Sequence, residues 1–337
     1  MKNLNINDCA RSHVIQVSLC LAVVLSLFTA CAPSSSLPPD SSQTRSSVAS
    51  LMPSNNVWKV PIDRLPVDSH SANYIRSIGA DKGMHLDFGS GTYDGSSIGI
   101  PITVLDGRST VKLVRPQFDY ADESDKGPYP IPTNLKIEGG SDRHVIVLDP
   151  AKKMLYEMFD VRPTGKTFEA GSGAIFDLTK NDTRPVGWTS ADAAGLPIAP
   201  GLVQYDELMD AVKTSGDLGH AVRFTVQNTR NVYVWPATHA ASDKTSSDLS
   251  PMGQRFRLRK DFAIENYSPE NQVILRTLKK YGMILADNGS NWFLSGTPDE
   301  RWNNDMLNEF KRVRGAAFEA VDTKSIESSN SYSARGF

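Results

Sequence analysis

Between Val57 and Phe262, short apolar runs are separated by frequent glycine, proline, asparagine and aspartate residues. Apolar runs of about four to eight residues bounded by such turn formers are typical of β-strands. We expect strands at HVIVLD, KMLYEMFDV, GAIFDL, HAVRFTV and NVYVWPA. Because no strand there alternates with a long helical pattern, a doubly wound parallel sheet is not expected. The pattern predicts a mainly β protein, built as an antiparallel, jelly-roll-like β-sandwich.

Three pairs of apolar runs are predicted to form β-hairpins. The segment HVIVLDPAKKMLYEMF turns at Asp149, and HAVRFTVQNTRNVYVW turns near Asn228. In MILADNGSNWFL, Asn288 is followed by glycine between two apolar runs. An Asn-Gly dipeptide in that setting favours a tight two-residue turn.

Two helices are predicted after the strands. The first has Ser268 as its cap and Pro269 as its first residue, and it ends at Gly282. The second begins with a capping box formed by Thr297 and Glu300. Each carries apolar residues at helical spacing, so we expect both helices to pack against the sandwich.

The N-terminus has the pattern of a secretory signal peptide. An apolar stretch, Val14 to Phe28, follows the basic residues Lys2 and Arg11. It is shorter than the roughly 20 residues that span a membrane, and small residues follow it. The last residues, FTAC up to Cys31, resemble the lipobox of bacterial lipoproteins, with phenylalanine in place of the usual leucine.

The lipobox resemblance implies that residues 1–30 are removed and that Cys31 carries a lipid. An ordinary signal cleavage nearby, which would leave a free thiol, is the alternative. Cys9 and Cys20, the other two cysteines, would leave with the signal, so we expect no disulfide framework. The expected location is the cell envelope, held by the lipid anchor alone. Because Ala32 follows the cysteine, the outer membrane is expected if the host is diderm.

Composition divides the rest of the chain into three parts. A Ser- and Pro-rich tether is expected over residues 31–51, the β-sandwich domain with its C-terminal helices over 52–322, and a disordered tail over 323–337. The net charge is −2, with acidic and basic residues interspersed. Such a distribution argues against nucleic acid as a partner.

Acidic residues among glycines, prolines and aromatics suggest cleavage of a glycan. Hydrolysis of a glycosidic bond requires one protonated and one ionised carboxyl facing each other. The candidates are Asp192, Asp87, Glu138 and Glu207. Asp192 is favoured because Trp188 lies only four residues before it; an Asp192→Asn variant should then lose activity with an almost unchanged melting temperature. The alternatives are exposed acids and turn formers, with Asp192 as the cap of a short turn.

Aromatic and basic residues supply candidate substrate contacts. Trp188 and Trp292 lie beside Gly and Ser, so partly exposed indoles could act as platforms for sugar rings. Arg223 and His239 could bind an anionic group, although Arg223, inside an apolar strand, fits a buried ion pair equally well.

Two histidine–aspartate pairs are spaced two residues apart: His85 with Asp87, and His144 with Asp142. In a strand such residues share a face, so each pair could help to bind a divalent cation. The alternative is that each histidine bonds its acidic neighbour. Beyond that cation, no cofactor is firmly implied. Ser97 lies in a G-x-S-x-G sequence, but it lacks the strand–turn–helix context of a hydrolase nucleophile.

These patterns together predict a surface-anchored, carbohydrate-active enzyme, a glycoside hydrolase with paired carboxylates. Its partner would be a polysaccharide or another envelope glycan. Two alternatives remain open: a non-catalytic lipoprotein that binds glycan or assembles with an envelope partner, and a polysaccharide lyase that uses histidine, arginine and tyrosine.

Overall fold

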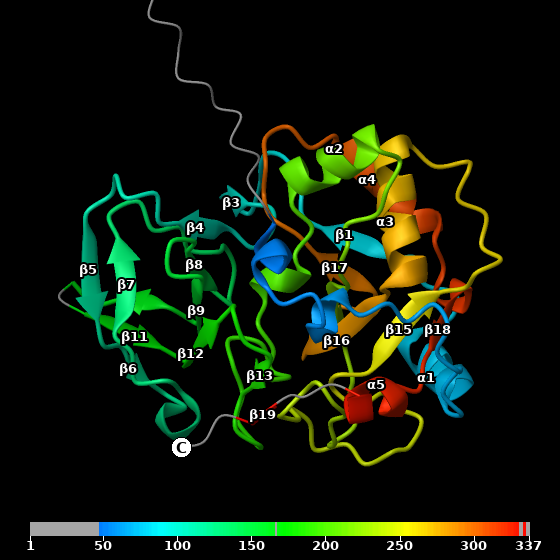
Figure 1. The fold of residues 1–337 in the computed structure, drawn as a ribbon, viewed down its shortest axis with the longest axis horizontal. Helices are drawn as coiled ribbons and strands as arrows, with labels where there is room; N and C mark the ends of the chain where they lie inside the picture. The colour runs from blue at the N-terminus through cyan, green and yellow to red at the C-terminus, as the bar shows by residue number, and fades with distance from the viewer. Residues whose placement is uncertain (1–46, 166, 330–332, 335–337) are drawn as a thin grey trace, which may run out of the picture. The chain divides into compact units, whose positions relative to one another are not determined.

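The computed structural model of the chain describes residues 47–165, 167–329 and 333–334. Over these residues the protein is mainly β, with strands arranged in several sheets and short helices between them (Figure 1). The predicted signal peptide, Cys31 and the tether up to residue 46 lie outside the described residues. Within the described part, no helix has both the length and the apolar character to cross a membrane.

The largest sheet has six strands in the order β1-β17-β14-β16-β15-β18. Their bounds are β1 His85–Asp87, β14 Val222–Val226, β15 Arg255–Leu258, β16 Met283–Asn288, β17 Phe293–Ser295 and β18 Phe318–Ala320. The pairs β1–β17 and β14–β16 are parallel, and the other pairs are antiparallel. The prediction of purely antiparallel strands is therefore wrong for this sheet. A parallel pair needs a crossover, which β15 and the helix after it supply between β14 and β16.

The helices pack around this sheet (Figure 1). They are α1 Ser71–Ile78, α2 Tyr205–Lys213, α3 Pro269–Lys280, α4 Asn304–Asn308 and α5 Lys324–Ser329. Helix α2 contacts α3, α3 contacts β15, and α1 contacts β18. The first predicted C-terminal helix forms as α3, which begins at Pro269 and is followed by Gly282 at φ +67°, but the Ser268 side chain makes no capping hydrogen bond.

The second predicted C-terminal helix is much shorter than its pattern indicated. Only α4 and the 3-10 helix η5, Glu309–Arg312, form there. The backbone N–H of Thr297 donates to Val203 instead of starting a helix. Asn303 takes the capping role, and its side chain accepts from the N–H groups of Asp305 and Met306.

A second group of strands forms smaller sheets (Figure 1). The four-stranded sheet has the order β12-β9-β8-β4, with bounds β4 Ile102–Val104, β8 Val145–Asp149, β9 Met154–Phe159 and β12 Ser172–Asp177. The hairpin predicted at Asp149 is confirmed as the antiparallel pair β8–β9. Beside it are the sheets β5-β7 and β10-β11-β6, formed by β5 Val111–Val114, β6 Gln117–Phe118, β7 Tyr129–Pro132, β10 Arg162–Pro163 and β11 Phe168–Ala170. A short hairpin, β2 Thr92–Tyr93 with β3 Ser96–Ser97, lies apart from these sheets.

The hairpins predicted near Asn228 and at Asn288 are both wrong, because β14 pairs on both sides with strands from later in the chain. Strand β14 lies between β16 and β17, so Asn288 and Gly289 connect strands that are not neighbours. All five residues of β14 are buried, which suits a central position with partners on both sides. After Asn228 the chain leaves the sheet, and Tyr233 makes only an isolated bridge to Met252.

The folded part extends beyond both predicted domain limits of 52 and 322. Val48 is 1% exposed and joins the main apolar core. At the other end, α5 occupies part of the predicted disordered tail, and β19, Ser333–Ala334, pairs in parallel with β13, Asp182–Thr183. At the N-terminal end, Val48 and Met52 find partners in the core that the local sequence does not reveal.

Candidate functional site

A cleft of about 610 Å³ opens at β1, the edge strand of the six-stranded sheet. One wall is the β2–β3 hairpin, and another is formed by α4 and η5 through Asn304, Asn308 and Lys311. The loop from Glu138 to Gly140 closes a third side. The cleft therefore lies where β1 and the hairpin that follows it meet two segments that are distant in sequence.

Two of the predicted carboxylates, Asp87 and Glu138, line this cleft. Asp87 ends β1, and its side chain is 55% exposed. Partial burial raises the pKa of Asp87, the negative charge of Glu138 raises it further, and His85 opposes both. The Nε2 atom of His85 lies 3.8 Å from the Asp87 carboxylate. Together these effects give Asp87 a higher pKa than an ordinary aspartate.

Glu138 has a different environment, because His144 is bonded to it. Nδ1 of His144 is 2.5 Å from Oε2 of Glu138, and Nε2 is 3.1 Å from the carbonyl oxygen of Ala191. A carbonyl oxygen can only accept, so Nε2 carries a hydrogen, and Nδ1 shares a second one with the carboxylate. Burial lowers the pKa of His144, but the hydrogen bond and charge of Glu138 outweigh it and raise it to about 9. At neutral pH, His144 is therefore an imidazolium bonded to Glu138.

Behind the cleft lies a buried ion network centred on Arg223. Asp192 is 0% exposed, and both of its carboxylate oxygens accept hydrogen bonds from the Arg223 guanidinium, at 2.7 and 2.5 Å. Arg223 also donates to Oγ of Ser295 at 2.6 Å. The expectation that Asp192 is a catalytic acid in an open loop is therefore contradicted, since it does not line the cleft. Its partner, 31 residues further along the chain, could not be identified from the local pattern.

A second aspartate, Asp287, lies 3.5 Å from the same guanidinium. Burial and the charge of Asp192 raise the pKa of Asp287 to about 8, against the opposing charge of Arg223. The protonated Asp287 side chain is hydrogen-bonded to Asp192. Arg223 thus contacts two aspartates: both carboxylate oxygens of Asp192 accept from it, and the protonated Asp287 lies beside it.

Glu157 is a further buried acid, which sequence reasoning missed. Its carboxylate accepts from the backbone N–H groups of Ile198 and Ala199, both at 2.8 Å. Burial raises the pKa of Glu157 to about 7, although these hydrogen bonds act in the opposite direction. An acid in the middle of the apolar strand segment LYEMF was the available signal.

The remaining predicted site residues lie elsewhere. Glu207 pairs with His220 at 3.1 Å and does not line the cleft. Trp292, expected to be partly exposed, is completely buried, stacks on Phe224 and Phe318, and donates its indole N–H to Gly79. Its role as a sugar platform is therefore ruled out by packing.

Trp188 and His239 are partly exposed but are not among the residues that line the cleft. The Arg184 guanidinium lies 5.3 Å from the Trp188 ring. Nδ1 of His239 bonds to the carbonyl oxygen of Ala193 at 2.7 Å, and Nε2 lies 3.8 Å from Glu123.

The two predicted cation sites do not form. Asp142 accepts from Ser141 rather than meeting His144, and both ring nitrogens of His144 are already engaged. His85 and Asp87 do lie together. Across the described residues, however, no group of three or more His, Cys, Asp or Glu side chains could hold a metal ion.

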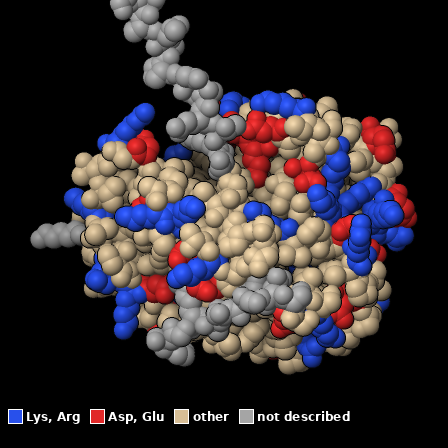
Figure 2. Space-filling view, viewed as in Figure 1, with Lys and Arg blue, Asp and Glu red and all other residues tan. Residues whose placement is uncertain are grey.

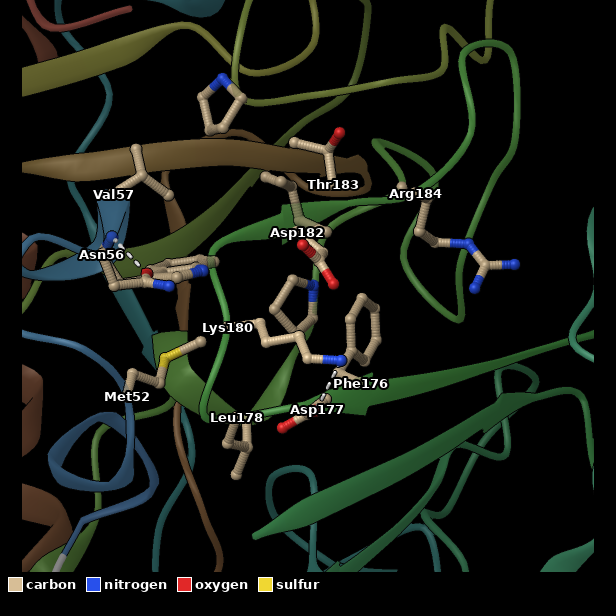
Figure 3. A pocket seen from close by; sticks show the side chains of 15 residues that line it. Met52, Asn56, Val57, Phe176, Asp177, Leu178, Lys180, Asp182, Thr183 and Arg184 are labelled. Carbon is tan, nitrogen blue, oxygen red and sulfur yellow. Dashed lines mark hydrogen bonds and ion pairs between the residues drawn. The ribbon is translucent and has the colours of Figure 1, made fainter. Parts of the chain in front are cut away.

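A second hollow, near Met52 and Lys180, is shown in Figure 3. Its volume of about 30 Å³ leaves space for little more than a water molecule. Lys180 reaches across its edge to Asp177 at 3.2 Å. We therefore place the candidate site in the larger cleft.

Figure 2 shows acidic and basic side chains intermingled over the face in view.

Comparison with protein-family models, with curated proteins and with solved structures finds no match to this chain.

Proposed function

We propose that the protein is a glycoside hydrolase, with Asp87 as the general acid and Glu138 as the ionised carboxylate. The observation that carries the proposal is that both line one cleft in different environments: the pKa of Asp87 is raised, and Glu138 is bonded to the His144 imidazolium. Pairs of titratable groups whose environments separate their protonation in this way are typical of acid–base assignments. The proton held by Asp87 would pass to the glycosidic oxygen, and Glu138 would act as nucleophile or activate a water.

The charges in the cleft support hydrolysis over elimination. Asp87, Asp94 and Glu138 line it with a single lysine, Lys311. A uronate polymer, the substrate of a lyase, would meet repulsion there, so we propose a neutral glycan as substrate. Binding without catalysis is the second candidate function, because the side-chain amides of Asn304 and Asn308 also line the cleft and can hold sugar hydroxyls.

We further propose that the four- and six-stranded sheets stack as the layers of a β-sandwich that supports the cleft. The main apolar core supports this arrangement. It contains Leu148 and Phe176 of the four-stranded sheet together with Phe224 and Phe256 of the six-stranded sheet.

Asp87→Asn should lower the rate of hydrolysis by a hundredfold or more, because it removes a general acid. The melting temperature should change little, since the side chain is half exposed. The measurement is reducing-end release from β-glucan, xylan, mannan, chitin and peptidoglycan, with alginate and pectate as polyanionic substrates.

Asp94→Asn is the matched control, because Asp94 lines the same cleft and asparagine tolerates its φ of +49°. It should remain active. If the wild type binds one of these glycans but cleaves none of them, the second candidate function, binding without catalysis, is favoured. Ultraviolet absorbance from unsaturated products would instead identify a lyase.

The envelope location is also part of this proposal, and Cys31 is its test. Cys31→Ala should abolish incorporation of labelled palmitate and release the protein from the membrane fraction. After removal of Cys9 and Cys20 with the signal, no other thiol is left in the chain to accept the lipid. Undiminished labelling of the variant would contradict the lipid anchor.

A further inference from the structure

We propose that Tyr93 is the surface on which a sugar ring stacks in the cleft, held at its working distance by a contact between Ser96 and Gly139. This inference rests on the proposed function and adds a substrate-positioning residue to it. Tyr93 lines the cleft, yet 81% of it is exposed. A large aromatic side chain gains free energy when it is covered, and the C–H face of a sugar ring can cover it.

The hairpin that carries Tyr93 has a fixed geometry. Asp94 and Gly95, its two turn residues, both have positive φ, +49° and +79°, as the tight turns of two-residue hairpins require. Tyr93 pairs with Ser96 across the hairpin. Just before β2, the N–H of Ser90 donates to Oδ1 of Asn304 at 3.0 Å, and Nδ2 of Asn304 donates back to the Ser90 carbonyl at 3.1 Å. These bonds tie the hairpin to α4, which forms another wall of the cleft.

A second tie joins the hairpin to the carboxylate loop. A Cβ atom built on Gly139 would lie 2.0 Å from the Cβ of Ser96, closer than any two such atoms can approach. Gly139 directly follows Glu138 in the chain. The absence of a side chain at position 139 therefore lets the hairpin, with Tyr93, lie against the residue next to the carboxylate. This spacing would position a ring stacked on Tyr93 beside Glu138.

The substrate class that follows is a neutral glycan whose sugar rings present an apolar face. Stacking on an uncharged ring does not depend on charge, and the acids of the cleft disfavour a polyanion. Because the ring would be held equally in the ground state and the transition state, its contribution should appear in KM more than in kcat.

Tyr93→Ala should raise KM about tenfold for whichever neutral glycan of the panel the wild type hydrolyses, with kcat and the melting temperature nearly unchanged. Tyr93→Phe should keep the wild-type KM, because it retains the ring. Tyr120→Ala is the matched control, since Tyr120 is 53% exposed and is not among the cleft residues.

The Ser96–Gly139 contact is tested by a rescue. Gly139→Ala should lower kcat/KM tenfold or more, because the new methyl group displaces the hairpin or the Glu138 loop. Ser96→Gly alone removes its side of the contact and should lower kcat/KM by less than Gly139→Ala does; added to Gly139→Ala, it should restore kcat/KM to the level of Ser96→Gly alone. After that change the nearest remaining atom of residue 96 is its Cα, at 3.5 Å.

The outcomes separate the two proposals. If the wild type hydrolyses a glycan and Tyr93→Ala has the same KM as Tyr120→Ala, the stacking role is overturned while the hydrolase stands. If Ser96→Gly fails to rescue Gly139→Ala, the spacing contact is overturned. If the wild type neither binds nor cleaves any glycan of the panel, the proposed function fails and this inference fails with it.

Discussion

Asp192→Asn should lower the free energy of unfolding by about 3 kcal/mol and the melting temperature by about 5–10 °C. The substitution removes the salt-bridge partner that accepts two hydrogen bonds from the buried Arg223 guanidinium. Breaking a buried pair by removing one partner leaves an uncompensated charge, which typically costs about 3–5 kcal/mol. We expect the lower end, because Asp287, 3.5 Å from the guanidinium, can ionise in its place.

Asp287→Asn is the matched control on the same arginine, and at pH 7 it should not destabilise the protein, because it removes the cost of keeping Asp287 protonated in the folded state. Asp287 holds a proton there, since burial and the charge of Asp192 raise its pKa to about 8. Asparagine reproduces the shape of that neutral acid and can still donate to Asp192. The double variant should be destabilised by more than the sum of the single variants, because Arg223 then has neither anion.

Urea denaturation of the four proteins at pH 7 measures this double-mutant cycle. An additive cycle, or an Asp192→Asn protein with wild-type stability, would contradict the ion network. The catalytic hypothesis for Asp192 that its loop sequence favours leads to the opposite result, an inactive protein with an unchanged melting temperature.

Stability should fall as the pH rises from about 5 to about 9. The folded-state pKa values of Asp287, Glu157 and His144 are raised to about 8, 7 and 9. Each is above the value in the unfolded chain, so between the two values the folded protein binds the proton and the unfolded chain does not. The stabilising contribution is full below the unfolded pKa and is lost as the pH rises through the folded one. Each such group lowers the free energy of unfolding by about 1.4 kcal/mol per pH unit within its window.

The pH ranges over which these groups lose their protons overlap, so the free energy of unfolding should fall continuously. Asp287 acts from about pH 4 to 8, and His144 acts from about 6.5 to 9. Asp287→Asn should remove the first contribution, so the stability of the variant relative to the wild type should rise steadily from about pH 4 to about pH 8 and stay higher at pH 9. Melting temperatures measured across this range check both statements. A wild type that becomes more stable from pH 5 to 9 would overturn the assigned protonation states.

Local patterns predicted the parts of the fold that local interactions determine. The β8–β9 hairpin and α3 follow from apolar runs, a turn and a proline within one short segment each. The position of β14 does not, because its partners β16 and β17 begin about 60 residues later and displace the hairpins that neighbouring runs favoured. Pairing at that distance is decided by burial in the finished sheet, which leaves no local mark.

The candidate site was predicted only in part for the same reason. Asp87 and Glu138 could be named as candidate acids, but only the fold brings them to one cleft. Asp192 has the same sequence context as a catalytic loop acid, and only its contact with Arg223 distinguishes it. Tyr93, next to the turn at Asp94, was passed over, because its sequence indicates a turn and not what the turn faces.

The pairing of β1 with β17 has a consequence for the order in which the protein matures. Asp87 lies on β1, whose partner strand begins at Phe293, roughly 200 residues later in the chain. Contacts of such long sequence separation form slowly, because loop-closure entropy is lost before they are gained. If the chain is exported N-terminus first, the edge that carries Asp87 stays unpaired until almost the whole polypeptide has emerged. The proposed catalytic acid would then be assembled among the last elements, and an interrupted chain would have no partial activity.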